Sequence, residues 1–345
     1  MNLVSTLKDL ISIESETGNE KNILAYIEKF LLDNGFNGEL LHSEGGIIAI
    51  PKKSRKKIAL VGHVDTVPIV NNQKVNFGDD FIGGRGSVDM KGGIAIILHS
   101  LIESNNNIIG VFYTAEEGSY KDNGLNIIMP KIIEKFKLNF SIILEPTNNE
   151  IQLGCLGALN ATLILKGKAA HSARPWVGDN PIYKLDNVIE YVKKNELKEI
   201  NIEGLVFKQV MSITKVFSGI ANNVIPEEVV LNINFRYSPE MDHLEASNYI
   251  TELFNHFGVV EILNCSDGAR PNLNNKFVKN FITKTNLPVE PKQAWTDVAR
   301  FYSQGIPSIN FGPGDPLLAH STEEHLSKKQ LLESYSLLSR FLEGN

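Results

Sequence analysis

Short apolar runs and amphipathic stripes alternate along the first part of the chain. Between Asn19 and Asn34, apolar residues recur with the period of an α-helix, and the stripe stops at Asn34-Gly35. Short runs rich in β-branched residues follow at 47–50, 58–61, 108–113 and 140–144. Two more helical patterns lie between the later runs, at 93–104 and 124–136. Strands that alternate with helices predict an α/β fold with a mostly parallel sheet covered on both faces.

The pattern changes in the middle of the chain. Longer runs, in which apolar and polar residues alternate as in a half-buried antiparallel sheet, occupy 158–166, 210–217 and 228–237. Two amphipathic helices and another strand interleave with them at 180–194, 241–257 and 259–263. Short elements then return, including a strand at 308–311. We therefore predict an α+β domain of residues 158–266, inserted into a catalytic domain of residues 1–157 and 267–345.

The composition indicates a soluble globular enzyme. A chain of 345 residues with 42% hydrophobic and 21% charged residues is long enough for two domains. The net charge of -6 argues against a nucleic-acid partner. No apolar run approaches the ~20 residues of a membrane span, and residues 1–12 show no signal-peptide pattern. Cys155 and Cys265 are too few for a disulfide framework, so we expect a cytoplasmic protein with no membrane partner.

Metal-binding residue types follow the predicted strands. Loops beyond the carboxyl ends of strands in an open α/β sheet meet in one crevice. The residues in such positions are His63, Asp65, Asp89, Glu116, Glu117, Glu145 and His320. Two imidazoles and several carboxylates suit borderline divalent cations, zinc above all. The sequence therefore predicts a metallohydrolase.

Most of these residues also have a structural explanation when each is taken alone. His63 could be a surface histidine beside a helix-capping Asp65, and Asp89 fits an N-cap as well as a bridging ligand. Glu116-Glu117 is more informative, because adjacent carboxylates at the end of a buried strand repel each other unless cations neutralise them. One of the two can bind metal while the other takes a proton from water, as metal-assisted hydrolysis requires.

The motifs around these residues resemble those of the M20 family of di-zinc aminoacyl amidohydrolases. The motifs that carry the resemblance occupy residues 61–68, 86–93, 114–118, 144–146 and 319–321. The resemblance implies two divalent metal ions, zinc first and cobalt as the alternative. It implies that His63 and Glu145 hold one ion, that Glu117 and His320 hold the other, and that Asp89 bridges both.

The same resemblance assigns further roles near the ions. It implies that Glu116 is the general base and that Asp65 supports His63. It also implies a cis peptide bond between Asp89 and Met90. In the inserted domain, it implies that His171 reaches the active site of the partner subunit in a homodimer and stabilises the oxyanion. Without the resemblance, a loop histidine would be the preferred interpretation of His171.

A narrower resemblance is to the succinyl-diaminopimelate desuccinylase branch of the family, of the actinobacterial type. It is carried by residues 86–93, 144–148, 170–176, 222–226, 234–236 and 295–320, with a departure at Ser321-Thr322, where that branch more often has a charged residue. The substrate would be a small N-acyl amino acid with three carboxylates, which calls for guanidinium and amide donors. Candidate substrate-binding residues are Arg236, Asn222, Asn223, Arg300, Arg174 and Thr296.

Several alternatives remain open from the sequence. Arg236 and Arg300 could form surface ion pairs, and Asn222 and Asn223 could make a turn. The enzyme could be another M20 acylase or dipeptidase, such as an acetylornithine deacetylase, a hydrolase of carrier-bound lysine or an enzyme like carboxypeptidase G2. It could also be a catalytically silent, metal-stabilised binding scaffold. Glu116 argues against the scaffold, because such a protein need not keep a base that binds no metal.

Overall fold

The chain divides into two compact units. The computed structural model describes residues 2–52, 58–69, 75–103 and 108–343. Unit 1 comprises Met1–Leu153, Asn272–Glu290 and Arg300–Asn345, and unit 2 comprises Gly154–Pro271 and Pro291–Ala299. The predicted insertion, 158–266, falls inside the first segment of unit 2. Within the described residues, no helix is both long enough and apolar enough to cross a membrane.

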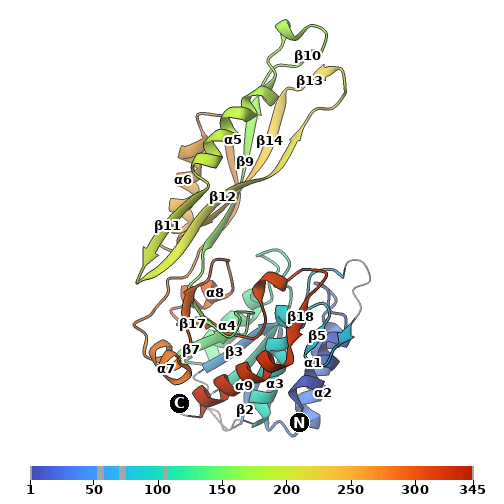
Figure 1. Cartoon of the computed structure of the whole chain (residues 1–345), viewed down its shortest axis with the longest axis vertical. Coiled ribbons are helices and arrows are strands. Elements are labelled where there is room, and N and C mark those ends of the chain that lie inside the picture. The colour runs from blue at the N-terminus through green and yellow to red at the C-terminus, as the bar shows by residue number, and fades with distance from the viewer. Residues whose placement is uncertain (1, 53–57, 70–74, 104–107, 344–345) are drawn as a thin grey trace. The chain divides into compact units, whose positions relative to one another are not determined.

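Unit 1 is built on an eight-stranded sheet (Figure 1). Its strands, in spatial order, are β1 (Gly38–Ser43), β2 (Gly46–Pro51), β6 (Ile108–Tyr113), β3 (Ile58–His63), β7 (Phe140–Ile143), β17 (Ser308–Asn310), β8 (Ile151–Leu153) and β16 (Val289–Pro291). The central strands β6, β3, β7 and β17 run parallel. Antiparallel pairs flank them, β1 with β2, β2 with β6, and β17 with β8. The predicted α/β fold is confirmed, with the parallel strands at its centre.

Helices bury the apolar strands of this sheet. Those that lie wholly in unit 1 are α1 (Leu3–Ser12), α2 (Lys21–Asp33), α3 (Gly92–Glu103), α4 (Leu125–Lys135), α7 (Lys276–Thr285) and α9 (Lys328–Leu342), and α8 (Val298–Ser303) crosses from unit 2. α3 is apolar on almost every side because it packs on β3 and β6 and is itself contacted by α1, α2 and α9. The predicted helix at 93–104 is confirmed as α3, although Ser104 lies outside the described residues.

A small sheet and two short helical segments complete unit 1. The sheet has the order β18 (His325–Ser327), β5 (Phe81–Gly83) and β4 (Asn76–Phe77). The helical segments are η1 (Ser87–Lys91), which leads into α3, and η4 (Pro316–Leu318). β18 pairs with β5 in antiparallel register, His325 opposite Gly83. This pairing joins the end of the chain to the segment that precedes η1.

Unit 2 contains a five-stranded sheet in which neighbouring strands are antiparallel. The strands, in spatial order, are β11 (Leu197–Ile202), β12 (Leu205–Ser218), β14 (Glu228–Tyr237), β9 (Gly157–Lys166) and β15 (Val259–Ser266). Alternate residues of β9 and β14 are buried, and they share one core with α5 (Leu185–Lys194) and α6 (His243–Phe254), as the predicted alternation requires (Figure 1). Three smaller elements are β10 (Ala170–His171), β13 (Val224–Ile225) and η2 (Pro175–Val177).

Two predictions for unit 2 need correction. The helix expected at 180–194 begins as a 3₁₀ segment, η3 (Pro181–Lys184), and becomes α-helical only from Leu185. The segment starts at a proline and the Asn180 side chain caps Ile182 N–H, a geometry that suits a tight first turn. The sequence pattern also missed β11, whose residues are mostly exposed and therefore carry no apolar alternation.

Candidate metal centre

His63 lies at the buried end of β3. Its side chain is 1% exposed, and the two ring nitrogens face different residues. Nδ1 lies 3.0 Å from the backbone oxygen of Asp65 and 3.5 Å from its Oδ1. Nε2 lies 3.0 Å from Asp89 Oδ1. The ring is therefore oriented mainly by the Asp65 carbonyl, and its other nitrogen is directed at a carboxylate.

The Asp65 carboxylate organises the loop that carries the paired glutamates. Oδ1 accepts a hydrogen bond from Glu116 N–H at 3.0 Å, and Oδ2 accepts one from Glu117 N–H at 3.1 Å. Oδ2 also accepts from the Thr17 hydroxyl at 2.8 Å. Burial raises the pKa of Asp65, but the hydrogen bonds with His63, Glu116 N–H and Thr17 outweigh burial and keep it below its usual value. A fully buried anion thus joins the end of β3 to the loop after β6.

Asp89 lies between the two imidazoles. Its Oδ1 faces His63 Nε2 at 3.0 Å, and its Oδ2 faces His320 Nε2 at 3.3 Å. The peptide bond between Asp89 and Met90 is cis, so the conformation expected from the family resemblance is confirmed. The side chain therefore presents one oxygen to each histidine, as a bridging ligand would.

His320 completes the cluster from the last part of the chain. Its backbone has φ of +63°, and its Nε2 lies 3.0 Å from Glu117 Oε1. The ligand atoms of three triplets lie within 4.8 Å of one another: His63, Asp89 and Glu145; Asp89, Glu117 and His320; and His63, Glu116 and Glu117. The first two triplets share Asp89 and together contain all five predicted ligands. They form two adjacent positions, each lined by one imidazole and two carboxylates.

The electrostatics of the cluster favour bound cations. Hydrogen bonds to Asp89 and Glu117 raise the pKa of His320 to about 10. Burial lowers the pKa of His63, but hydrogen bonds to Asp65 and Asp89 outweigh burial and leave it well above its usual value. Both imidazoles thus lie where positive charge is stabilised. Nitrogen and oxygen donors in this ratio fit divalent ions such as zinc.

His171 and the predicted amide donors lie on unit 2. His171 ends β10, and its Nδ1 accepts a hydrogen bond from Ala173 N–H at 3.1 Å. In the neutral ring the proton is then on Nε2, which makes that nitrogen a donor. Asn222 and Asn223 precede β13, and the Asn223 carbonyl accepts from Ser172 N–H at 2.9 Å. This bond holds the asparagine pair beside the histidine.

Three further candidates for substrate binding, Arg236, Arg174 and Thr296, differ in their burial and in their partners. Arg236 lies on β14 between Val210 and Ala158, and its guanidinium makes no hydrogen bond or ion pair with any residue that the structure describes. Burial lowers its pKa. Arg174 is exposed at the start of η2, whereas Thr296 is buried and its carbonyl lies 3.7 Å from the Cys155 thiol.

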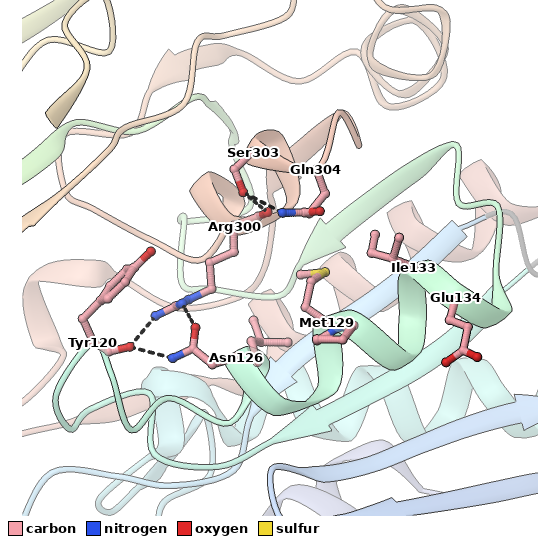
Figure 2. A pocket seen from close by; sticks show the side chains of 10 residues that line it. Tyr120, Asn126, Met129, Ile133, Glu134, Arg300, Ser303 and Gln304 are labelled. Atoms are coloured by element: carbon pink, nitrogen blue, oxygen red, sulfur yellow. Dashed lines mark hydrogen bonds between the residues drawn. The ribbon is translucent and has the colours of Figure 1, made fainter. Parts of the chain in front are cut away.

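Arg300 is engaged inside unit 1. Together with Asn126 and Tyr120 it lines a hollow of about 580 Å³. Figure 2 shows the guanidinium directed at Asn126 and Tyr120. It donates to Asn126 Oδ1 and, at 3.0 Å, to the Tyr120 carbonyl, and its Cζ lies 3.9 Å from the centroid of the Tyr120 ring. The guanidinium therefore contacts the segment that follows Glu117, and a role of Arg300 in substrate binding stays a prediction.

Sequence reasoning missed three residues that support the cluster. Thr17 binds Asp65, and Arg85 and Glu324 form a buried ion pair beside Asp89. The available signals were weak: an arginine between two glycines just before Asp89, and a glutamate shortly after His320.

Comparisons with known protein sequences find matches over most of the chain. Residues 59–344 match the model of peptidase family M20/M25/M40. A Corynebacterium glutamicum protein named succinyl-diaminopimelate desuccinylase is 34% identical over 346 residues, which cover 96% of this chain and 94% of the relative.

Solved structures share the fold over almost the whole chain. A tripeptidase from Staphylococcus aureus has a TM-score of 0.79 and 21% identity, and the match covers 99% of this chain and 97% of that one. An M20 family metallo-carboxypeptidase from Sulfolobus solfataricus has a TM-score of 0.77 and 18% identity, with 99% of each chain covered. At these identities the structures establish the fold alone.

Proposed function

Because this chain belongs to peptidase family M20/M25/M40 and is a metal-dependent amidohydrolase, we propose that it hydrolyses N-succinyl-LL-2,6-diaminopimelate. The products are succinate and LL-2,6-diaminopimelate, a precursor of lysine. The observation that carries the choice of substrate is the similarity, over nearly the whole chain, to a relative named for this reaction. On unit 2, the guanidinium of Arg236 has no partner among the residues that the structure describes, and this supports the proposal because the substrate carries three carboxylates.

The proposed metal centre holds two divalent ions, zinc first and cobalt as the alternative. His63, Asp89 and Glu145 would hold one ion, and Asp89, Glu117 and His320 the other. Bound there, the ions would polarise the substrate carbonyl and lower the pKa of a water molecule.

The side chains of the protein then carry the remaining steps. Glu116 takes a proton from the attacking water, whose oxygen bonds to the succinyl carbonyl carbon. His171 donates from Nε2 to the oxyanion that develops on the carbonyl oxygen. The carbon–nitrogen bond breaks as Glu116 passes the proton to the leaving amine, and Arg236 binds a substrate carboxylate.

The oligomeric state and location are part of the same proposal. We propose a cytoplasmic homodimer formed through unit 2, in which His171 of each subunit serves the site of the other. Asn222 and Asn223 would supply amide contacts to the substrate, because a backbone hydrogen bond holds Asn223 beside the loop of His171. Arg174 and Thr296 remain predicted contacts.

A substrate panel tests the proposal. Zinc-loaded enzyme is offered N-succinyl-LL-2,6-diaminopimelate, N-acetylornithine, and di- and tripeptides, and the release of amine is followed. We expect the highest kcat/KM with the succinyl substrate and none with Glu116→Gln. If another compound of the panel is cleaved faster, that compound replaces the succinyl compound as the proposed substrate. Binding of substrates without turnover of any of them would favour the scaffold.

A further inference from the structure

Two loops that carry predicted metal ligands are far apart in the sequence but in contact in the structure. We call residues 84–91 the Asp89 loop and residues 312–324 the His320 loop. They adjoin the paired strands β5 and β18, and Gly84 N–H donates to the Glu324 carbonyl at 3.0 Å. The two glycines on either side of Arg85, Gly84 and Gly86, have φ of +145° and +79°, conformations that a side chain would strain. The backbone thus turns sharply on both sides of Arg85.

The carboxylate of Glu324 binds the Asp89 loop through hydrogen bonds. The side chain is 1% exposed. Its Oε1 accepts hydrogen bonds from Val88 N–H at 3.0 Å and from Asp89 N–H at 3.2 Å. Its Oε2 accepts from Arg85 Nη1 at 2.8 Å. Because both oxygens are engaged by N–H donors, Glu324 acts on the bridging aspartate through the backbone and is not itself placed as a ligand.

Arg85 extends the contact to the His320 loop. Its side chain is 4% exposed, and its Nη1 also donates to the Ser321 carbonyl at 3.2 Å. Its Nη2 donates to the His320 carbonyl at 3.4 Å. The planar fork of a guanidinium can reach a carboxylate and two carbonyls together, which an ammonium group cannot do with the same geometry. One side chain therefore fixes the backbone of His320.

Packing restrains the position of His320 less than that of His63 and Asp89. Its side chain is about half exposed, whereas those of His63 and Asp89 are largely buried. Packing therefore restrains His320 little, and its loop is held through the carbonyls that Arg85 binds. A buried ion pair adds little net stability compared with apolar residues of similar volume. The role of the Arg85–Glu324 pair is therefore to orient the backbone of the two loops.

We propose that Arg85 and Glu324 are positioning residues that set the affinity of the second ion position, formed by Asp89, Glu117 and His320. This inference rests on the proposed two-ion centre. The pair fixes two of the three ligands of that position relative to each other. Of the first position, formed by His63, Asp89 and Glu145, it contacts only Asp89. Loss of the ion pair should therefore weaken binding of the second ion more than binding of the first.

The test measures two metal dissociation constants by competition with a chromogenic chelator. Glu324→Gln keeps an acceptor for the loop amides and removes the ion pair, and Arg85→Lys keeps the charge and removes the fork. Glu323→Gln is the matched control, because Glu323 is the exposed neighbour. Residues that orient metal ligands typically contribute about 10–100-fold in affinity. We expect the second ion to bind at least about tenfold more weakly in both variants, with the first changed less than about threefold and the control unchanged.

A double-mutant comparison assigns the loss to one position. In a His320→Ala background only the first ion remains, so adding Glu324→Gln should change its affinity little. An equal loss for both ions, or no loss, would overturn the inference. Circular dichroism checks folding, and if Glu324→Gln unfolds, Glu324→Asp replaces it with the same expected ratio. Failure of the wild-type protein to bind two ions would instead refute the proposed centre itself.

Discussion

The buried Asp65 carboxylate offers the sharpest test of how the site is built. It accepts hydrogen bonds from Glu116 N–H, Glu117 N–H and Thr17, and it is fully buried. Asp65→Ala leaves two peptide donors without their acceptor. Removing one member of a buried charged interaction costs about 3–5 kcal/mol, so we expect the free energy of unfolding to fall by about that amount. Asp65→Asn keeps the shape and one acceptor, and should cost about 1–3 kcal/mol.

Urea unfolding in a buffer with chelator measures this loss, because no bound ion then contributes to stability. Hydrogen exchange supplies the local readout: the amides of Glu116 and Glu117 should be protected in the wild type and exchange faster in both Asp65 variants. Thr17→Val is the matched control, since it removes only the one donor that lies near solvent. We expect it to cost less than about 1 kcal/mol. If Asp65→Ala costs no more than Thr17→Val and exchange at 116–117 is unchanged, the carboxylate does not hold this loop.

Three further predictions test other parts of the molecule. Glu116→Gln should bind metal like the wild type but lose turnover, because an amide cannot accept a proton from water; loss of metal on analysis would make Glu116 a ligand. Mixing Glu116→Gln with His171→Ala should restore part of the activity once subunits exchange, since a mixed dimer contains one site with both residues intact; continued inactivity after proven exchange would contradict the cross-subunit role. Burial lowers the pKa of His99, whose ring lies against Thr6, Phe30 and Tyr335 with Glu103 nearby. The unfolded state then binds more protons, so stability should fall as pH drops through about 6.5, and His99→Gln should reduce that slope in urea unfolding at several pH values.

The metal cluster could be predicted because its residues follow the strands of a parallel sheet. His63 ends β3, Glu116 and Glu117 follow β6, and Glu145 follows β7. Parallel pairing of these strands brings their carboxyl ends to one edge, so a pattern of strands is enough to predict that the side chains converge. The types of these residues, histidines and carboxylates, then restrict which kinds of metal ion can bind.

The supporting contacts were harder to predict, because they depend on backbone groups. The acceptor role of Asp65 involves peptide N–H groups, which any sequence possesses. Glu324 likewise binds two backbone amides of a distant loop. The sequence also did not reveal Asn126 and Tyr120 as partners of Arg300. In unit 2, β11 was missed because an exposed edge strand has little apolar pattern.

The spread of the ligands along the chain has a consequence for biosynthesis. Glu117 and His320 are separated by 203 positions, and Val88 and Glu324 by 236. All of unit 2 is synthesised before His320, so the second ion position cannot form until the segment that follows unit 2 has also been made. Contacts between such distant segments form only after long loops have closed, which places completion of the site late in folding. The second ion position therefore forms only when the two parts of unit 1 that flank unit 2 in the sequence have come together.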